Sequence, residues 1–441
     1  MTFNDQSELA RWACSEATRA GANEARVTVS RTRYVSLSYR ERKVENLEES
    51  VTNGLNVDLY VDGKYSGHST SDLRPEALTK FLQEAVAMTR YLSEDPHRRL
   101  PDAQYYANRP STDLQLVDAS YRRVTPEERH RFVQAVEAAA LGAGGDKIIS
   151  TTASYYDSIT ETSIVASNGF EGRSERTDFW SGADVTARDE GDKRPEDWWW
   201  EGGCYQGRLA DPAMIGKKAV ERALARVGSD KIATEKMSII VENRAAGRLF
   251  NFMAGALQGR NLQQRQSFFE GKLGQQVASP LLSVVDDPLV VHGLASRHFD
   301  YEGISARRLP IVEKGILRNY YIDTYYGRKL SMDPTTGSAS NVVVELGDKD
   351  QAGWMRELGR GILVTGFLGG NSNSSTGDFS AGIAGFLFEN GEIVKPVSEM
   401  NLAGNHLEFW HKLIGVGNDP YPFSSLRTPS LVFEGITMAG A

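Results

Sequence analysis

Cysteine, a surplus of basic residues and long apolar runs are scarce or missing in this sequence. Its 441 residues include two cysteines, Cys14 and Cys204, which are too few for a disulfide framework or for a zinc site built from several thiolates. Acidic residues outnumber basic ones by 58 to 50, for a formal net charge of −8. This balance argues against a protein that holds nucleic acid through an excess of Lys and Arg.

The pattern of a membrane segment or a secretion signal is also missing. No apolar run approaches the roughly 20 residues that a membrane helix needs. The opening residues, MTFNDQSELA, lack a basic stretch followed by an apolar one. We therefore expect a cytoplasmic protein that binds neither membrane nor nucleic acid.

Length and composition indicate a folded protein with more than one core. The chain is 40% hydrophobic and 24% charged, so it can bury enough apolar surface to offset its conformational entropy. A chain of 441 residues exceeds what one core usually organises, and we expect two or three. Glycine is in excess, with 42 residues where an average composition would give about 7%.

The first half of the chain uses one order of elements twice. Apolar spacing predicts a helix over 6–20, and alternating residues then predict antiparallel strands with hairpin turns at Asn53-Gly54 and Asp62-Gly63. Pro75 lies in the first turn of a second predicted helix. This helix–meander–helix unit covers residues 5–93.

The second unit covers residues 125–228. It begins with a capping box at Thr125 and continues through strand-like residues over 148–187. A helix that begins at Asp211-Pro212 completes it. We interpret the repeated order as a structural duplication within an N-terminal α/β domain over 1–230.

Strands and glycine-rich turns dominate the rest of the chain. A β-run is predicted over 236–241 and a helix over 244–257, followed by short strands joined by hairpins. The fold class predicted is therefore α+β, with a C-terminal domain over 231–441 that contains a curved antiparallel sheet. A long glycine-rich loop is expected over 365–378.

That glycine-rich loop does not fit a phosphate site, because it lacks both the GxxxxGK[ST] and the GxGxxG patterns and carries Asp378. Glycine does permit close approach of a backbone to a ligand. We regard a plain surface connection and a contact in a ligand cleft as comparable alternatives. The cleft candidates are Gly369, Gly370, Asn371, Ser372 and Asn373.

Two other clusters suggest an interface or a metal. Trp198, Trp199 and Trp200 are consecutive and cannot all face one side of a strand, so at least one is exposed or enters an interface. His406, Glu408 and His411 are the most metal-like group, but their histidines point about 140° apart on an ideal helix. We expect a helix with Trp410 packed inward and keep a metal site as the less favoured alternative.

From about Ile239 onward the sequence resembles the TldD/PmbA family, whose members were once called modulators of DNA gyrase. The resemblance rests on motifs in family order and at family-like spacing. These include Gly293-Leu-Ala-Ser296, Phe299-Asp-Tyr-Glu302-Gly303, Tyr326-Gly-Arg328, Thr376-Gly-Asp378, Glu389-Asn-Gly-Glu-Ile393, Pro396-Val-Ser-Glu399 and Val416-Gly-Asn-Asp419.

The resemblance implies a difference in metal binding between two branches of the family. The TldD branch is similar to zinc peptidases with a HExxxH motif and a later cysteine ligand. Here the histidine positions are Asn243 and Arg248, the glutamate position is Arg244, and no cysteine follows Asp419. Amide and guanidinium groups are poor zinc ligands, so the sequence resembles the PmbA (TldE) branch.

That branch implies a metal-free subunit with no catalytic residue of its own. Its partner would be a TldD-like peptidase that supplies the zinc, and the substrate an extended or unfolded peptide. Two alternatives stay open. One is a self-standing metallopeptidase, alone or as a homodimer, with a metal at His406, Glu408 and His411. The other is a non-enzymatic interaction protein connected with gyrase or a toxin–antitoxin pair.

Overall fold

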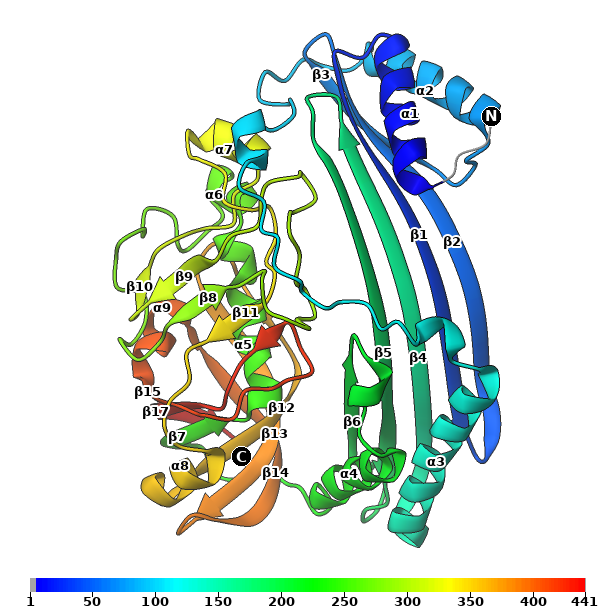
Figure 1. Ribbon diagram of the computed structural model, residues 1–441. Helices are drawn as coiled ribbons and strands as arrows, with labels where there is room; N and C mark the ends of the chain where they lie inside the picture. The colour runs from blue at the N-terminus through cyan, green and yellow to red at the C-terminus, as the bar shows by residue number, and fades with distance from the viewer. Residues whose placement is uncertain (1–4, 441) are drawn as a thin grey trace.

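A six-stranded antiparallel sheet forms the N-terminal half of the molecule, which is known from a computed structural model describing residues 5–440. Its strand order is β3-β2-β1-β4-β5-β6. The strands are β1 (Glu24–Arg40), β2 (Lys43–Val61), β3 (Lys64–Thr70), β4 (Ile148–Ala166), β5 (Glu171–Ala187) and β6 (Glu196–Gly203). Four of the six have 17 to 19 residues, so the sheet is long and curved (Figure 1).

Four helices cover one face of this sheet (Figure 1). They are α1 (Gln6–Arg19), α2 (Pro75–Thr89), α3 (Pro126–Gly144) and α4 (Pro212–Ala225). Alternate strand residues such as Val27, Val57 and Phe179 are buried against them, as the two-residue period of a strand requires. The opposite face turns toward the C-terminal half.

The predicted duplication is confirmed. Both units read helix, three strands, helix, and they join in the middle of the sheet, where β1 pairs with β4 from Arg26↔Ala166 to Arg40↔Thr152. Prolines open α2, α3 and α4, and Thr125 forms the predicted capping box. The boundary between residues 230 and 231 stays a prediction.

One predicted turn is right and one is wrong. Asp62 and Gly63 have φ of 51° and 74° and connect β2 to β3. Asn53-Gly54 instead lies inside β2, where Asn53 is opposite Arg31 of β1. The turn between β1 and β2 is made by Glu41 and Arg42, both at positive φ.

The C-terminal half is built around a second six-stranded sheet, in the order β14-β13-β12-β7-β17-β15. A further pairing of β14 with β17 closes it into a barrel. All its pairs are antiparallel except β7 with β12. The strands are β7 (Glu235–Val241), β12 (Arg360–Ser372), β13 (Asp378–Glu389), β14 (Glu392–Asn405), β15 (Leu413–Val416) and β17 (Leu431–Ala439).

Smaller elements pack on this barrel. A five-stranded sheet contains β8 (Val284–Asp286), β9 (Leu309–Glu313), β10 (Ile316–Leu317), β11 (Val342–Val344) and β16 (Leu426–Arg427). The helices are α5 (Asn243–Ala254), α6 (Gly259–Gln263), α7 (Thr324–Leu330), α8 (Gln351–Leu358) and α9 (His406–Phe409). One large core joins α5 to both sheets.

The predicted 365–378 loop is mostly strand. β12 runs to Ser372 and β13 starts at Asp378, so only the residues between them form a turn. The pairing of β12 with β13 shifts register between Val364 and Gly366 and again between Leu368 and Asn371. Gly369 and Gly370, at φ of 74° and 109°, make the second shift possible. Glycine here serves bulges in a strand rather than an open loop.

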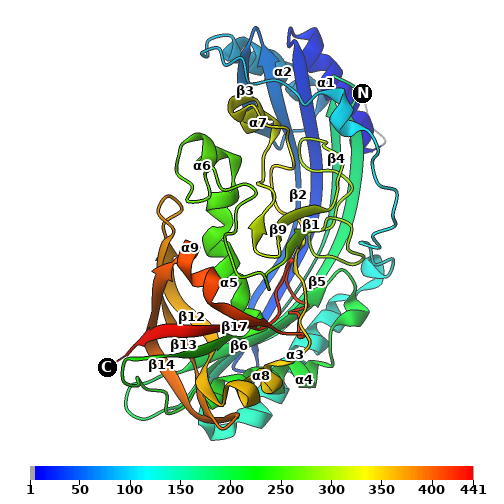
Figure 2. The ribbon, with the colours of Figure 1, turned by 90° about the vertical axis from the view of Figure 1, so that its left-hand side faces the viewer.

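The two halves also meet through the segment between α2 and α3, which passes between them in Figure 1 and runs down the right-hand edge of the view in Figure 2. The guanidinium of Arg328 in α7 donates hydrogen bonds to the backbone carbonyls of Arg99 and Leu100 at 2.8 and 2.6 Å. This contact holds the upper ends of the halves together. Within residues 5–440, no helix is both long enough and apolar enough to cross a bilayer.

Candidate functional site at the central cleft

A cleft of about 1170 Å³ lies between the two halves; we call it the central cleft. Its N-terminal wall is formed by Arg40, Ser150, Thr152, Asp184–Thr186, Asp189 and Lys193–Trp198, and its base by Arg226 and Ser229–Lys231. Its C-terminal wall is formed by Arg244, Ala245, Gly247, Arg248, Asn251, Thr365–Leu368, Ser398, Glu399, Tyr421, Ser424, Leu426 and Thr428. Acidic and basic side chains are interleaved along it.

The helix α5 brings two of the three substituted zinc-motif positions to this cleft. Arg244 and Arg248 lie one turn apart on α5 and both line the cleft. Asn243, at the first position of the helix, is bonded to the segment that follows β15. Its side-chain amide donates to the backbone carbonyl of Asp419 at 2.6 Å, and its backbone carbonyl accepts from the hydroxyl of Thr428 at 2.9 Å.

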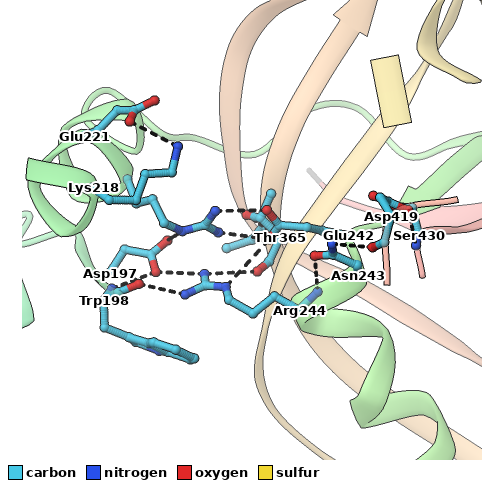
Figure 3. Close-up of polar contacts among 12 residues, drawn as sticks. Asp197, Trp198, Lys218, Glu221, Glu242, Asn243, Arg244, Thr365, Asp419 and Ser430 are labelled. Atoms are coloured by element: carbon cyan, nitrogen blue, oxygen red, sulfur yellow. Dashed lines mark hydrogen bonds and ion pairs between the residues drawn. The ribbon is translucent and has the colours of Figure 1, made fainter. Parts of the chain in front are cut away.

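Arg244 crosses the cleft to the edge strand β6 (Figure 3). One guanidinium nitrogen is 2.8 Å from Asp197 Oδ1, and another donates to the carbonyl of Trp198 at 2.8 Å. The guanidinium carbon is also 4.2 Å from the centre of the Trp198 ring. A third hydrogen bond, of 3.5 Å, goes to the carbonyl of Thr365, so the arginine side chain occupies the space between α5 and β6.

A second arginine completes the charge network. Arg222 of α4 makes two parallel hydrogen bonds of 2.9 Å to Glu242 and lies 3.6 Å from Asp197. Glu242 is in turn 3.7 Å from Arg244. Two carboxylates and two guanidiniums thus neutralise one another, in the bidentate geometry that arginine favours. The carboxylate of Glu242 also precedes the N-terminus of α5, where a negative charge is favourable.

Arg226, at the end of α4, has no carboxylate at ion-pair distance within the described chain. It donates to the backbone carbonyl of Glu196 on β6. Burial lowers the pKa of Arg226; Asp197 opposes this shift and the neighbouring Arg244 and Arg222 add to it. The carbonyls of Glu196 and Trp198 on the edge strand are therefore both capped by arginines that border the cleft.

These residues do not fit a zinc ion. The amide of Asn243 is bonded to the backbone, and Arg244 offers only donors in a cluster already balanced in charge. Arg248 places its guanidinium 4.8 Å from the Phe252 ring centre. Among residues 5–440, no group of three or more His, Cys, Asp or Glu side chains is arranged to hold a metal.

Sequence reasoning did not identify Asp197 as the partner of Arg244. The only signal near it was the run of three tryptophans, of which at least one was expected to be exposed or at an interface. Trp198 is 38% exposed and borders the cleft, in agreement with that expectation. Trp199 packs toward the helix-covered core.

The glycine-rich candidates lie just beyond the cleft. The cleft contacts on β12 are Thr365–Leu368. Asn371, Ser372 and Asn373 line a separate and more open hollow with Asp378 and Ser380, and Gly369 and Gly370 form the bulge between the two sites. The strand that carries the predicted residues thus borders the central cleft through the four residues that precede them, Thr365–Leu368.

His406, Glu408 and His411 are not brought together. His406 is buried, while Glu408 and His411 are exposed. The indole N–H of Trp410 donates to Nδ1 of His406 at 3.3 Å, so the other ring nitrogen carries the proton and donates to the hydroxyl of Ser372 at 3.1 Å. Ser372 donates onward to the carbonyl of Phe252 at 3.2 Å. Both ring nitrogens are therefore used inside the core.

Comparison with known proteins places these features in a family. Three family models match in succession: PmbA/TldA metallopeptidase domain 1 over residues 25–89, the central domain over 120–227 and the C-terminal domain over 234–440. The Metalloprotease PmbA of Escherichia coli O157:H7 is 31% identical over 94% of this chain and 92% of its own length. A Metalloprotease PmbA homolog of Haemophilus influenzae is 29% identical over 96% and 94%.

Solved structures agree with these matches. A putative modulator of DNA gyrase from Bacteroides thetaiotaomicron is 40% identical, covers all of both chains and superimposes with a TM-score of 0.96. TldE from Thermococcus kodakarensis has the same fold, with a TM-score of 0.85 at 20% identity over 98% of this chain and 100% of its own. The chain described here belongs to the PmbA/TldD family.

Proposed function

We propose that this chain is the metal-free subunit of a heterodimeric TldD/TldE-type zinc metallopeptidase. In this proposal the TldD-like partner carries the zinc and the catalytic glutamate. The present chain contributes a wall of the enclosure that receives extended or unfolded peptide. Relatives named metalloproteases support the peptidase class, and the family also includes proteins named TldD and TldE.

The observation that carries the proposal is the state of Arg244. Zinc catalysis at α5 requires neutral or anionic donors and a carboxylate that can activate water. Arg244 instead forms an ion pair at 2.8 Å with Asp197 and covers the Trp198 ring. A positive charge fixed in this way repels a divalent cation and cannot act as a general base.

The cleft supports a peptide as the ligand. Its volume of about 1170 Å³ exceeds that of most pockets for drug-sized molecules. Its interleaved charges and its half-exposed Trp198 suit a chain with varied side chains better than one compact ion. Addition of the peptide as a strand to the edge of β6 is disfavoured, because arginines already cap the carbonyls of Glu196 and Trp198.

The decisive experiment compares the chain alone with the chain co-purified from its native host. Zinc per chain is measured by mass spectrometry of the metal, native mass by light scattering, and peptidase activity on an unfolded peptide with and without a chelator. We expect no bound zinc and no activity for the chain alone, and both for the pair. Stoichiometric zinc with chelator-sensitive activity in the isolated chain would overturn the proposal.

The same preparation tests the alternatives. A self-standing enzyme that uses His406 and His411 would lose activity in a His406→Ala, His411→Ala variant. A purely interacting protein would co-purify with a topoisomerase or a toxin rather than with a TldD-like chain. The buried and fully bonded imidazole of His406 argues against the first alternative.

A further inference from the structure

An apolar cavity of about 120 Å³ lies beneath α5, next to the central cleft; we call it the side pocket. Phe250 and Met253 of α5 form one wall, and Val284, Ile311 and Val342 from the small sheet form the facing wall. Phe269, Val277, Leu282 and Trp410 complete its floor. None of these side chains except Trp410 carries a polar group.

The two buried polar side chains that border the side pocket are bonded elsewhere, and the side-chain amides of exposed Asn251 and half-buried Gln258 also line it. The hydroxyl of Tyr321 donates to Asp286 at 3.1 Å, and the indole N–H of Trp410 donates to His406 at 3.3 Å. A cavity lined mainly by apolar side chains offers water few partners and accepts apolar groups. An apolar cavity of about 150 Å³ is known to take up benzene, so this one suits an aliphatic side chain.

The side pocket opens toward the central cleft. Asn251 and Leu426 line both spaces. Asn251, Ala254 and Ala339 are exposed although they also line the side pocket, so they mark its mouth. Asn251 lies one turn after Arg248, on the stretch of α5 that borders the cleft.

We infer that the side pocket is a subsite for one aliphatic side chain, of the size of leucine, isoleucine, valine or methionine, projecting from an extended peptide in the central cleft. This inference rests on the proposed function, because it assumes a peptide in that cleft. The inference adds a substrate class to the proposed function: unfolded segments that place one aliphatic side chain next to the part of the peptide that lies along α5. A charged or hydroxylated side chain would lose its hydration against walls that are mostly apolar.

The first test uses the isolated full chain and benzene as the probe, followed by ligand-observed NMR. Ala254→Leu and Ala339→Leu each add a side chain at the exposed mouth, so neither change disturbs the core. Ala138→Leu, exposed on α3 and outside both spaces, is the matched control. We expect saturable benzene binding by the wild type and the control, and its loss in both mouth variants. Unchanged binding in the mouth variants would overturn the inference.

The second test uses the complex with the TldD-like partner and two unfolded peptides that differ only by leucine or serine at one position, scanned along the sequence. We expect leucine to be favoured by about 10- to 100-fold in affinity at one position, and the preference to shrink to a few-fold in Ala254→Leu. The same preference in Ala254→Leu and in wild type would overturn the subsite. If the complex binds neither peptide, the proposed function fails, and the peptide subsite fails with it. Benzene binding in that case would show only that the cavity exists.

Discussion

The guanidinium of Arg244 lies 2.8 Å from Asp197, which joins α5 of the C-terminal half to the edge strand β6 of the N-terminal half. Both side chains are only 6% exposed, so solvent screens the pair little. The resemblance to the TldD branch implies a catalytic glutamate at position 244; the arginine found there links the two walls of the cleft instead.

Replacing Arg244 by alanine should destabilise the protein by about 3 kcal/mol, the low end for removal of one partner from a buried ion pair. Asp197 keeps Arg222 at 3.6 Å, which limits the loss. Unfolding in urea, followed by circular dichroism, measures the change. Arg248→Ala is the control, because Arg248 is exposed and has no carboxylate partner in the described chain; a change within about 0.5 kcal/mol is expected there. Equal stability of the two variants would contradict this account of Arg244.

Restoring the zinc motif alone should not restore zinc binding. The triple variant Asn243→His, Arg244→Glu, Arg248→His supplies two imidazoles, but no cysteine follows Asp419 to act as the third protein ligand. The new glutamate would also lie beside Asp197 and Glu242, whose charges would no longer be balanced by Arg244. Calorimetric titration with zinc at neutral pH should show no site tighter than about micromolar. Nanomolar binding would mean that another described side chain serves as the missing ligand.

The fold could be predicted where local chemistry decides it. Proline at the first turn of α2 and α4 and the capping box of α3 fix helix starts within a few residues. The turn predicted at Asn53-Gly54 was wrong because a dipeptide that tolerates a turn does not require one. Pairing with Arg31 and Ser30 of β1 continues β2 through these two residues. The length of these strands is set by the whole sheet, which local sequence does not reveal.

The site was predicted only in part, for the same reason. The substituted zinc motif pointed to α5, because Asn243, Arg244 and Arg248 lie close together in the sequence. Asp197 is 47 positions away from Arg244 and reaches it only through the register of β6 on β5, so no local signal marks the pair. The bulge at Gly369 and Gly370 likewise depends on pairing between β12 and β13, which decides that Thr365–Leu368, rather than the residues after them, meet the cleft.

Glu302 should make the protein less stable as pH rises from about 4.5 to about 7. Burial raises the pKa of Glu302 to about 7; hydrogen bonds from Thr324 oppose this shift, and Asp300 adds to it. The folded state therefore keeps a proton that the unfolded state releases above pH 4.5, and about 3 kcal/mol is lost across the window. Glu302→Gln should flatten the fall in melting temperature between pH 5 and pH 8, whereas exposed Glu434→Gln should not. Identical profiles for wild type and Glu302→Gln would exclude this role.

His406 should act in the opposite direction. Burial among Phe268, Phe379 and Trp410 lowers the pKa of His406 to about 4, whereas an unfolded histidine titrates near 6.5. As pH falls below 6.5 the unfolded chain takes up a proton that the folded chain refuses, so stability is lost down to about pH 4, by about 3 kcal/mol in all.

The variant His406→Gln removes this titration, at the cost of weaker hydrogen bonds to Trp410 and Ser372. It should be less stable than wild type at pH 7.5 but lose less stability between pH 6.5 and pH 4.5, as measured by urea unfolding at each pH. His411→Gln, at an exposed position in the same segment, should keep the wild-type profile. The opposite result, a flatter stability profile in His411→Gln and an unchanged one in His406→Gln, would contradict this prediction. The loss of stability at low pH would then not come from the buried His406, which is hydrogen-bonded to Trp410 and Ser372.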